Sequence, residues 1–287
     1  MTPLEKAAQT ALTTCMDLKQ SETLLVVTDD NKTEIGRAIY HTGKALAKEA
    51  LLLTMPPAEV NGQEPPRPVA ELMAKFDVVV CPTTKSLTHT DARRNACKQG
   101  ARVATMPGIS EDTMVRTLSA DYNRIAERTL KVSAILDKGK MVHVTTPLGT
   151  DLWLPIDGIK AISSTGLIRE PGKGGNLPSG ESYLMPEEGK SHGVLVIDAS
   201  VAGLGKIEKE PIKVTIADGY AVKFEGGPQA ELLFQQLNQF GQKGMTVAEL
   251  GIGTNHAAQI IGQILEDEKV MGTIHIAFGN NISMGGT

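Results

Sequence analysis

The chain has 287 residues, of which 41% are hydrophobic and 22% charged, a composition typical of a globular protein with a sizeable core. Its formal net charge of −4 argues against a nucleic-acid partner, and no apolar run reaches the roughly 18 residues of a membrane span. Cys15, Cys81 and Cys97 show no Cys-x-x-Cys spacing. We interpret them as reduced thiols of a cytoplasmic protein.

The first third of the chain alternates apolar runs with helical patterns. A run at 24–28 precedes a helical stretch over 33–49, and further runs follow at 51–54, 78–81 and 103–105. This alternation predicts βαβ units and a parallel sheet, so we expect an N-terminal Rossmann-like domain over residues 1–138. No Gly-x-Gly-x-x-Gly follows the first run, which argues against a dinucleotide site. Residues 110–136 are predicted to be helical.

The pattern changes to antiparallel hairpins in the second half. Runs at 141–146 and 151–155 flank a Pro-Leu-Gly-Thr turn, and runs at 212–216 and 220–224 flank Asp218-Gly219. A helix is predicted over 228–240. We therefore expect the fold class to be α/β, with a second, α+β domain over 139–287 that carries the functional site. The chain stops in a Gly/Asn-rich turn, from which we expect further chain in the natural protein.

Three residues of the second half, Glu181, Glu249 and His275, each lie at a Gly-punctuated strand end or turn. Two carboxylates and an imidazole from separate segments suit a divalent metal with one open coordination position. Each residue also has a structural explanation. Glu181 could be a solvated turn carboxylate, Glu249 could face solvent from its strand, and His275 could be a hydrogen-bonded strand residue that shares a face with Thr273 and Ala277.

Three acidic residues, Glu266, Asp267 and Glu268, lie just before the strand of His275. We interpret the first two as a charged helix end or loop. Glu268 is predicted to be the general base that takes a proton from a metal-bound water.

Four motifs together resemble the aminopeptidase T family of metallo-aminopeptidases. They are Thr146-Pro-Leu-Gly-Thr-Asp-Leu-Trp153, Asn176-Leu-Pro-Ser-Gly-Glu-Ser-Tyr183, Ala248-Glu-Leu-Gly-Ile-Gly253 and Asp267-Glu-Lys-Val-Met-Gly-Thr-Ile-His-Ile-Ala-Phe-Gly279. The resemblance implies a cytoplasmic homodimeric hydrolase that removes N-terminal residues from peptides with two zinc, cobalt or manganese ions. It implies that Glu181, Glu249 and His275 are metal ligands and that Glu268 lies near the site.

The chain departs from that family in three ways, one of which is that it is shorter than the typical peptidase. The family's remaining ligands form a His-x-Asp motif that this sequence does not reach, and its peptidases carry a Tyr at the position of Ile282. A sister group with the same fold consists of Fe(II) dioxygenases that open a dihydroxypyridine ring. Resemblance to that group implies that His275 is one of the iron ligands. We therefore predict a metallo-aminopeptidase first, with a ring-opening dioxygenase or a catalytically inactive relative as the alternatives.

Overall fold

The computed structural model describes residues 1–286, which divide into two compact units. Unit 1 comprises residues 1–126, 164–180 and 255–258, and unit 2 comprises 127–163, 181–254 and the chain from 259 onward. The chain therefore enters and leaves each unit more than once. Compact units need not be independently folding domains, so the single domain boundary predicted at residue 138 stays a prediction.

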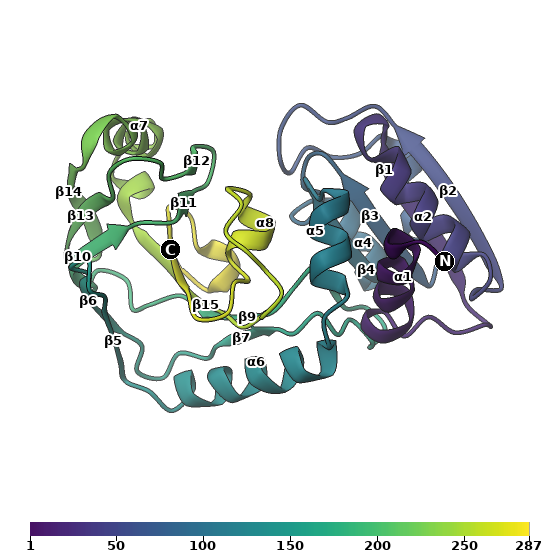
Figure 1. Cartoon of the computed structure of the whole chain (residues 1–287), viewed down its shortest axis with the longest axis horizontal. Helices are drawn as coiled ribbons and strands as arrows, with labels where there is room; N and C mark the ends of the chain where they lie inside the picture. Colours follow the sequence, from purple (N-terminus) through teal and green to yellow (C-terminus); the bar gives the residue numbers. More distant parts are fainter. Residues whose placement is uncertain (287) are drawn as a thin grey trace. The chain divides into compact units, whose positions relative to one another are not determined.

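Unit 1 contains a parallel sheet of five strands in the order β2-β1-β3-β4-β8 (Figure 1). Its strands are β1 (Thr23–Asp29), β2 (Glu49–Met55), β3 (Val78–Thr83), β4 (Arg102–Pro107) and β8 (Gly174–Asn176). Its helices are α1 (Pro3–Gln9), α2 (Thr33–Gly43), α3 (Arg67–Met73), α4 (Asp91–Lys98) and α5 (Glu111–Leu118), with short π and 3₁₀ turns at Thr10–Cys15 and Asp30–Lys32. The four strands predicted for the first third are confirmed, and β8 is an unpredicted fifth.

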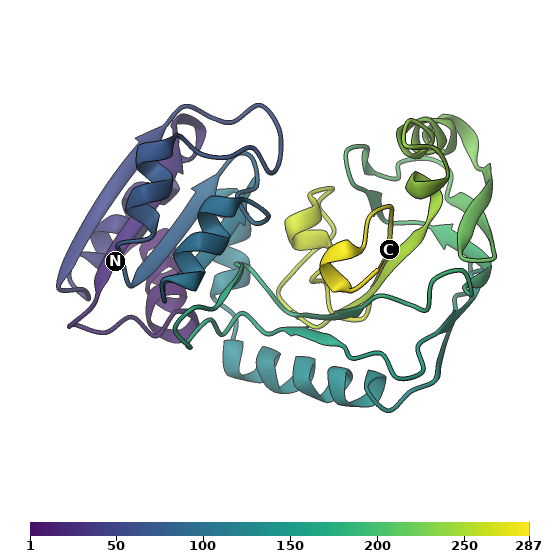
Figure 2. The ribbon, with the colours of Figure 1, turned by 180° about the vertical axis from the view of Figure 1, so that it is seen from behind.

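Helices cover both faces of this sheet, which is why β1, β3 and β4 are almost wholly buried. Leu25 and Val79 belong to a core cluster with side chains of α3 and α4, the helices on the near side of the sheet in Figure 2. Leu24 faces the opposite side, where α2 packs so closely that a Cβ on Gly43 would lie 2.1 Å from it. The predicted helix over 33–49 ends at Gly43, because the chain from Glu49 onward pairs with β1 instead.

The helix predicted over 110–136 is two helices, α5 and α6 (Tyr122–Leu136). The interruption has a local cause. The Asp121 side chain accepts hydrogen bonds from the backbone N–H groups of Asn123 and Arg124, which starts a new helix after α5 has ended. No helix within residues 1–286 combines the length and the apolarity needed to cross a bilayer.

Unit 2 is built on two sheets whose neighbouring strands pair mostly antiparallel, with the orders β14-β13-β10-β6-β5 and β16-β15-β9-β7. The strands are β5 (Met141–Thr145), β6 (Asp151–Pro155), β7 (Ile162–Ser164), β9 (Glu181–Leu184), β10 (His192–Ile197), β13 (Ile212–Ala217), β14 (Tyr220–Glu225), β15 (Val247–Gly253) and β16 (Ile274–Phe278). A small ribbon joins β11 (Ser200–Val201) to β12 (Gly205–Lys206), and the helical elements are α7 (Gly227–Asn238), α8 (Ile264–Asp267) and 3₁₀ turns at Gly241–Met245 and Ile282–Met284.

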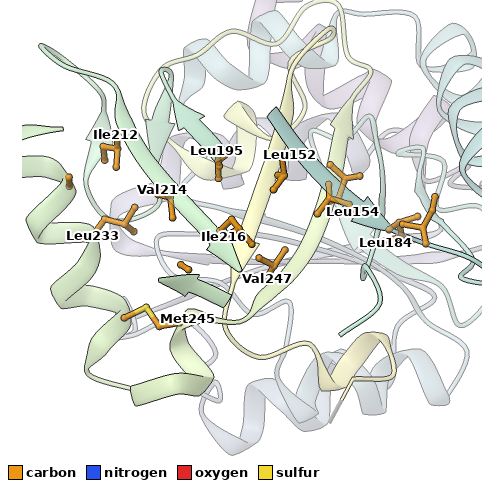
Figure 3. Packing of buried hydrophobic residues seen from close by; sticks show 14 of the residues in the cluster. Leu152, Leu154, Leu184, Leu195, Ile212, Val214, Ile216, Leu233, Met245 and Val247 are labelled. Atoms are coloured by element: carbon orange, nitrogen blue, oxygen red, sulfur yellow. The ribbon is translucent and has the colours of Figure 1, made fainter. Parts of the chain in front are cut away.

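Both predicted hairpins are confirmed. β5 pairs with β6, and β13 pairs with β14 through Asp218 and Gly219, whose φ values of 50° and 78° are left-handed, as a tight hairpin turn requires. The inward side chains of both sheets meet in one core, which includes Leu152, Leu195 and Val247 (Figure 3). The predicted α/β fold class, a parallel-sheet region together with a region of antiparallel hairpins, is therefore confirmed.

Candidate metal centre

The three predicted ligands lie on adjacent strands of the four-stranded sheet in unit 2. In the register of these strands, Gly253 of β15 is opposite Glu181 of β9, and Gly251 is opposite His275 of β16. Glu249 precedes Gly251 by two residues on the same strand. Because alternate side chains of a strand project to the same face, Glu181, Glu249 and His275 share one face of the sheet.

The opposite face of this sheet packs on the core of unit 2. Ile274, Ile276 and Phe278, which alternate with His275 along β16, contact the core cluster together with the buried Leu184 and Leu250. The alternation predicted for this strand is thus confirmed. Burial of the apolar face fixes the register, and a fixed register directs the polar residues to the other face.

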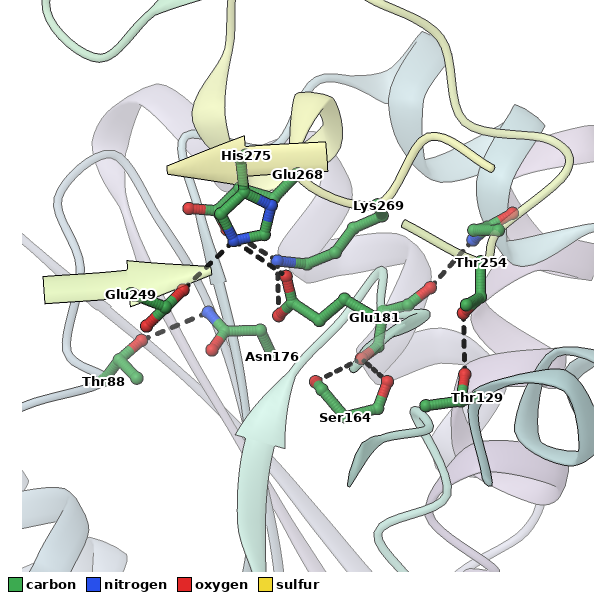
Figure 4. Close-up of polar contacts among 12 residues, drawn as sticks. Thr88, Thr129, Ser164, Asn176, Glu181, Glu249, Thr254, Glu268, Lys269 and His275 are labelled. Atoms are coloured by element: carbon green, nitrogen blue, oxygen red, sulfur yellow. Dashed lines mark hydrogen bonds and ion pairs between the residues drawn. The ribbon is translucent and has the colours of Figure 1, made fainter. Parts of the chain in front are cut away.

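The three side chains converge (Figure 4). The Nε2 atom of His275 lies 3.1 Å from Oε1 of Glu249, with which it forms a hydrogen bond, and 3.8 Å from Oε2 of Glu181. Glu181 is a buried strand residue with 7% of its surface exposed, so the solvated-turn explanation is wrong. Its Oε2 atom is buried and makes no hydrogen bond with any described residue. The spatial convergence is established, whereas the role of these residues as ligands stays a prediction.

Two glycines of β15 make room for this cluster. A Cβ on Gly251 would lie 2.0 Å from Cε1 and 2.2 Å from Nε2 of His275, so the imidazole ring lies directly over this glycine. A Cβ on Gly253 would lie 2.0 Å from the carbonyl oxygen of Val270, so the chain just after Lys269 passes against this second glycine. The Leu-Gly-Ile-Gly pattern of the strand is therefore a steric requirement of the site.

A buried lysine occupies one side of the cluster. The Nζ atom of Lys269 lies 2.8 Å from Oε1 of Glu181 and 2.6 Å from Oε2 of Glu268, and its side chain is only 3% exposed. The position of Glu268 near the site agrees with the prediction, whereas Lys269 was not predicted to belong to it. The signal available in the sequence was a single basic residue between an acidic run and the strand of the histidine.

Burial and mutual attraction shift the protonation equilibria of these groups. Burial raises the pKa of Glu181, and the neighbouring Glu268 adds to this effect against the opposing ammonium of Lys269. Burial acts to raise the pKa of Glu268 as well, but Lys269 and then His275 outweigh it, and the pKa is lowered. Burial opposes the charged forms of Lys269 and His275, yet the surrounding carboxylates raise the pKa of both.

The same carboxylates affect an adjacent phenol. Burial, followed by the charges of Glu181 and Glu249, raises the pKa of Tyr183 to about 12. Tyr183 of β9 and His275 of β16 lie on either side of Gly251 of β15 and pair with it in the strand register. Its hydroxyl is therefore a neutral hydrogen-bond donor at physiological pH.

The two remaining acidic residues of the run hold a loop. Glu266 and Asp267 are buried, and their carboxylates accept hydrogen bonds from the backbone N–H groups of Gln259, Ile261 and Gly262. The prediction that they belong to a helix end or loop is confirmed, although they are buried within it and not solvated.

The donor atoms of the cluster fit a divalent metal only in part. Glu181 Oε2, Glu249 Oε1 and His275 Nε2 are the oxygen and nitrogen donors that first-row metals take, and the buried Oε2 has no hydrogen-bond partner within residues 1–286. However, no group of three or more His, Cys, Asp or Glu side chains in residues 1–286 is arranged to hold an ion as it stands. The hydrogen bond between His275 and Glu249 would have to open for a metal to bind there.

Comparison with known proteins identifies the family. The sequence profile of the NicX family, described as 2,5-dihydroxypyridine 5,6-dioxygenase, matches residues 4–285. The chain belongs to this family. The resemblance to aminopeptidase T therefore pointed to a group that shares the fold. The chain itself belongs to the dioxygenase group that was predicted as the alternative.

A curated relative supports the same assignment. Over 196 residues the chain is 26% identical to the 2,5-dihydroxypyridine 5,6-dioxygenase of Pseudomonas putida, a stretch that covers 67% of this chain and 55% of the relative. The aligned part thus spans about half the length of that enzyme.

Two solved structures share the fold of this NicX-family chain. The dioxygenase structure from Pseudomonas putida KT2440 aligns with a TM-score of 0.82 at 19% identity and covers 98% of this chain and 88% of that one. Wild-type AmpT from Thermus thermophilus aligns with a TM-score of 0.70 at 16% identity and covers 99% and 87%. At these identities the likeness concerns the fold alone, and the AmpT match does not carry a peptidase activity over to this chain.

Proposed function

We propose that this protein is a ring-opening dioxygenase that acts on a dihydroxylated pyridine. The observation that carries the proposal is the family match over residues 4–285. It favours the alternative of the sequence analysis over the aminopeptidase that we predicted first. In such a reaction one ring bond breaks, both atoms of O₂ enter the product, and the ring supplies the electrons, so no external reductant is needed.

The polar cluster of unit 2 is the proposed site. Iron(II) would bring the hydroxylated ring and O₂ together, and His275 would contribute an imidazole to it, with Glu249 and Glu181 as the carboxylates within reach. The carboxylates around His275 raise the pKa of its ring and so favour the proton with which a bound ion would have to compete. Metal affinity is therefore expected to fall as the pH is lowered.

Glu268 is the proposed acceptor for the proton of a substrate hydroxyl. Of the two carboxylates that contact Lys269, Glu268 has a side chain that is 28% exposed and Glu181 one that is 9% exposed. A substrate can therefore reach Glu268 more readily than Glu181. The adjacent ammonium of Lys269 keeps Glu268 ionised and ready to accept a proton. Tyr183 would act as a neutral donor toward an oxygen atom of the substrate.

The test is anaerobic reconstitution with Fe(II), followed by oxygen uptake with 2,5-dihydroxypyridine as the substrate. We expect one O₂ consumed for each ring opened, loss of uptake in Glu268→Gln and His275→Ala, and no support of the reaction by zinc. Zinc- or cobalt-dependent hydrolysis of leucyl anilide without oxygen uptake would instead favour the peptidase and refute the proposal. The predicted homodimer is part of the proposal, and the mass of the protein in solution tests it.

A further inference from the structure

We propose that Lys269 sets the number of cations that this cluster accepts. Its ammonium takes the place of a cation between Glu181 and Glu268, which leaves only the side near His275 open to a divalent ion. This inference rests on the metal site of the proposed function. It concerns metal stoichiometry, however, so it can be tested apart from any enzymatic activity.

The contacts of Lys269 divide the cluster into two sides. Its Nζ atom binds Oε1 of Glu181 at 2.8 Å and Oε2 of Glu268 at 2.6 Å. The other oxygen of Glu181 lies 3.8 Å from Nε2 of His275 and has no hydrogen-bond partner among the described residues. The carboxylate of Glu181 thus accepts a hydrogen bond from Lys269 with one oxygen, and its other oxygen lies near the imidazole of His275 (Figure 4).

The lysine is held firmly in this place. Its side chain is 3% exposed, and the backbone that follows it packs against Gly253, where a Cβ would lie 2.0 Å from the carbonyl oxygen of Val270. A buried ammonium without its carboxylates would carry a large desolvation cost, so it does not leave them to make way for an ion. An ammonium also has three donors and no acceptor, so it cannot itself ligate a metal.

The charges of the cluster give the same result. Three carboxylates, Glu181, Glu249 and Glu268, surround one imidazole and one ammonium. With the ammonium in place, the net charge of Glu181, Glu268 and Lys269 together is −1 instead of −2, and the space between the two carboxylates is taken, so a second divalent ion is attracted less strongly. Without it, two carboxylates that already converge on one point within 2.6–2.8 Å would be free, and carboxylate oxygens are good ligands for manganese and zinc.

The experiment compares wild type with Lys269→Met, which removes the charge, and with Lys269→Arg, which keeps it. Each protein is dialysed against Mn²⁺ and its bound metal is counted by mass spectrometry, while calorimetric titration gives the affinity. We expect Lys269→Met to bind about one more equivalent than wild type, with an affinity about 100-fold above any second binding in wild type or Lys269→Arg. The double variant Lys269→Met, Glu268→Gln should lose the additional equivalent.

Removal of the lysine leaves the carboxylates of Glu181 and Glu268 uncompensated, so Lys269→Met is also refolded with and without Mn²⁺. Recovery of the folded protein by the ion, or a raised Tm on its addition, supports the proposal because the ion replaces the ammonium. Equal metal content in wild type and Lys269→Met, or a variant that manganese does not rescue, overturns it. Oxygen uptake by wild type is measured separately. Its absence would refute the dioxygenase proposal and leave the result on Lys269 unchanged.

Discussion

The substitution Gly251→Ala is expected to disable the site while leaving the fold intact. The added Cβ would lie 2.0 Å from Cε1 of His275, whereas ordinary van der Waals contact begins near 3.4 Å. The imidazole ring must therefore move by about 1.4 Å, the difference between these two distances. A shift of this size breaks the 3.1 Å contact of the ring with Glu249 and removes the ring from its place over β15.

The consequence can be estimated in rate and in stability. A misplacement of about 1 Å in a catalytic group costs about 100-fold in rate, so kcat/KM for oxygen uptake should fall by about that factor or more. The ring is partly exposed and can swing outward, so the free energy of unfolding should fall by only about 1–2 kcal/mol. Bound iron per chain, measured after reconstitution, should fall in parallel with the rate.

The matched control is Gly175→Ala in β8 of unit 1, another strand glycine. Its Cβ would meet the end of the Ile168 side chain at 3.3 Å, which a small side-chain adjustment relieves. We expect this control to keep activity within about threefold of wild type, since no residue of the polar cluster has to move. If Gly251→Ala also kept full activity and metal content, the position of the His275 ring over Gly251 would not be required for metal binding or catalysis, and the prediction would be wrong.

Three further predictions concern charge and burial. Glu181→Gln removes a buried partner of Lys269 and should lower the free energy of unfolding in urea by about 3 kcal/mol, and a loss near zero would contradict the buried ion pair. The hydrogen bond from Arg102 lowers the pKa of Glu22, so this pair stabilises the fold above the ordinary pKa of a glutamate and ceases to do so as the pH falls through the lowered value. Arg102→Met should therefore flatten the pH dependence of stability in that acidic window, and an unchanged profile would count against the pair. Burial raises the pKa of Cys81 to about 12, so its thiol should resist thiol reagents at pH 8 in the native protein and react in urea, as labelling mapped by mass spectrometry would report.

Local sequence patterns were sufficient where local causes decide the structure. The apolar runs of the first third predicted β1 to β4, and Asp218-Gly219 predicted a hairpin turn that requires two left-handed residues. The end of α2 and the break before α6 were missed. At Gly43 the pairing of the following chain with β1 outweighs a continuous helical pattern, and at Asp121 a single capping side chain is enough to divide a helix.

The candidate site was predicted in part for the same reason. Glu181, Glu249 and His275 could be singled out because burial of a polar side chain in an apolar strand costs free energy unless the group is paired or bound to a metal. Lys269 could not be distinguished from a solvated charge beside an acidic run, since its burial depends on contacts with a strand 88 residues away. Gly251 likewise resembled any strand glycine until β16 was placed beside it.

The amino-acid order by itself determined most of the strands and helices, and which side chains of β16 are apolar and which polar, because these properties depend mainly on neighbours a few residues away. The tertiary structure alone decided that an imidazole lies over one glycine and that a lysine stands between two carboxylates. Those facts depend on strand register and on burial. Both are set when distant segments share one core, and only there does an ammonium become a fixed counter-ion to two glutamates.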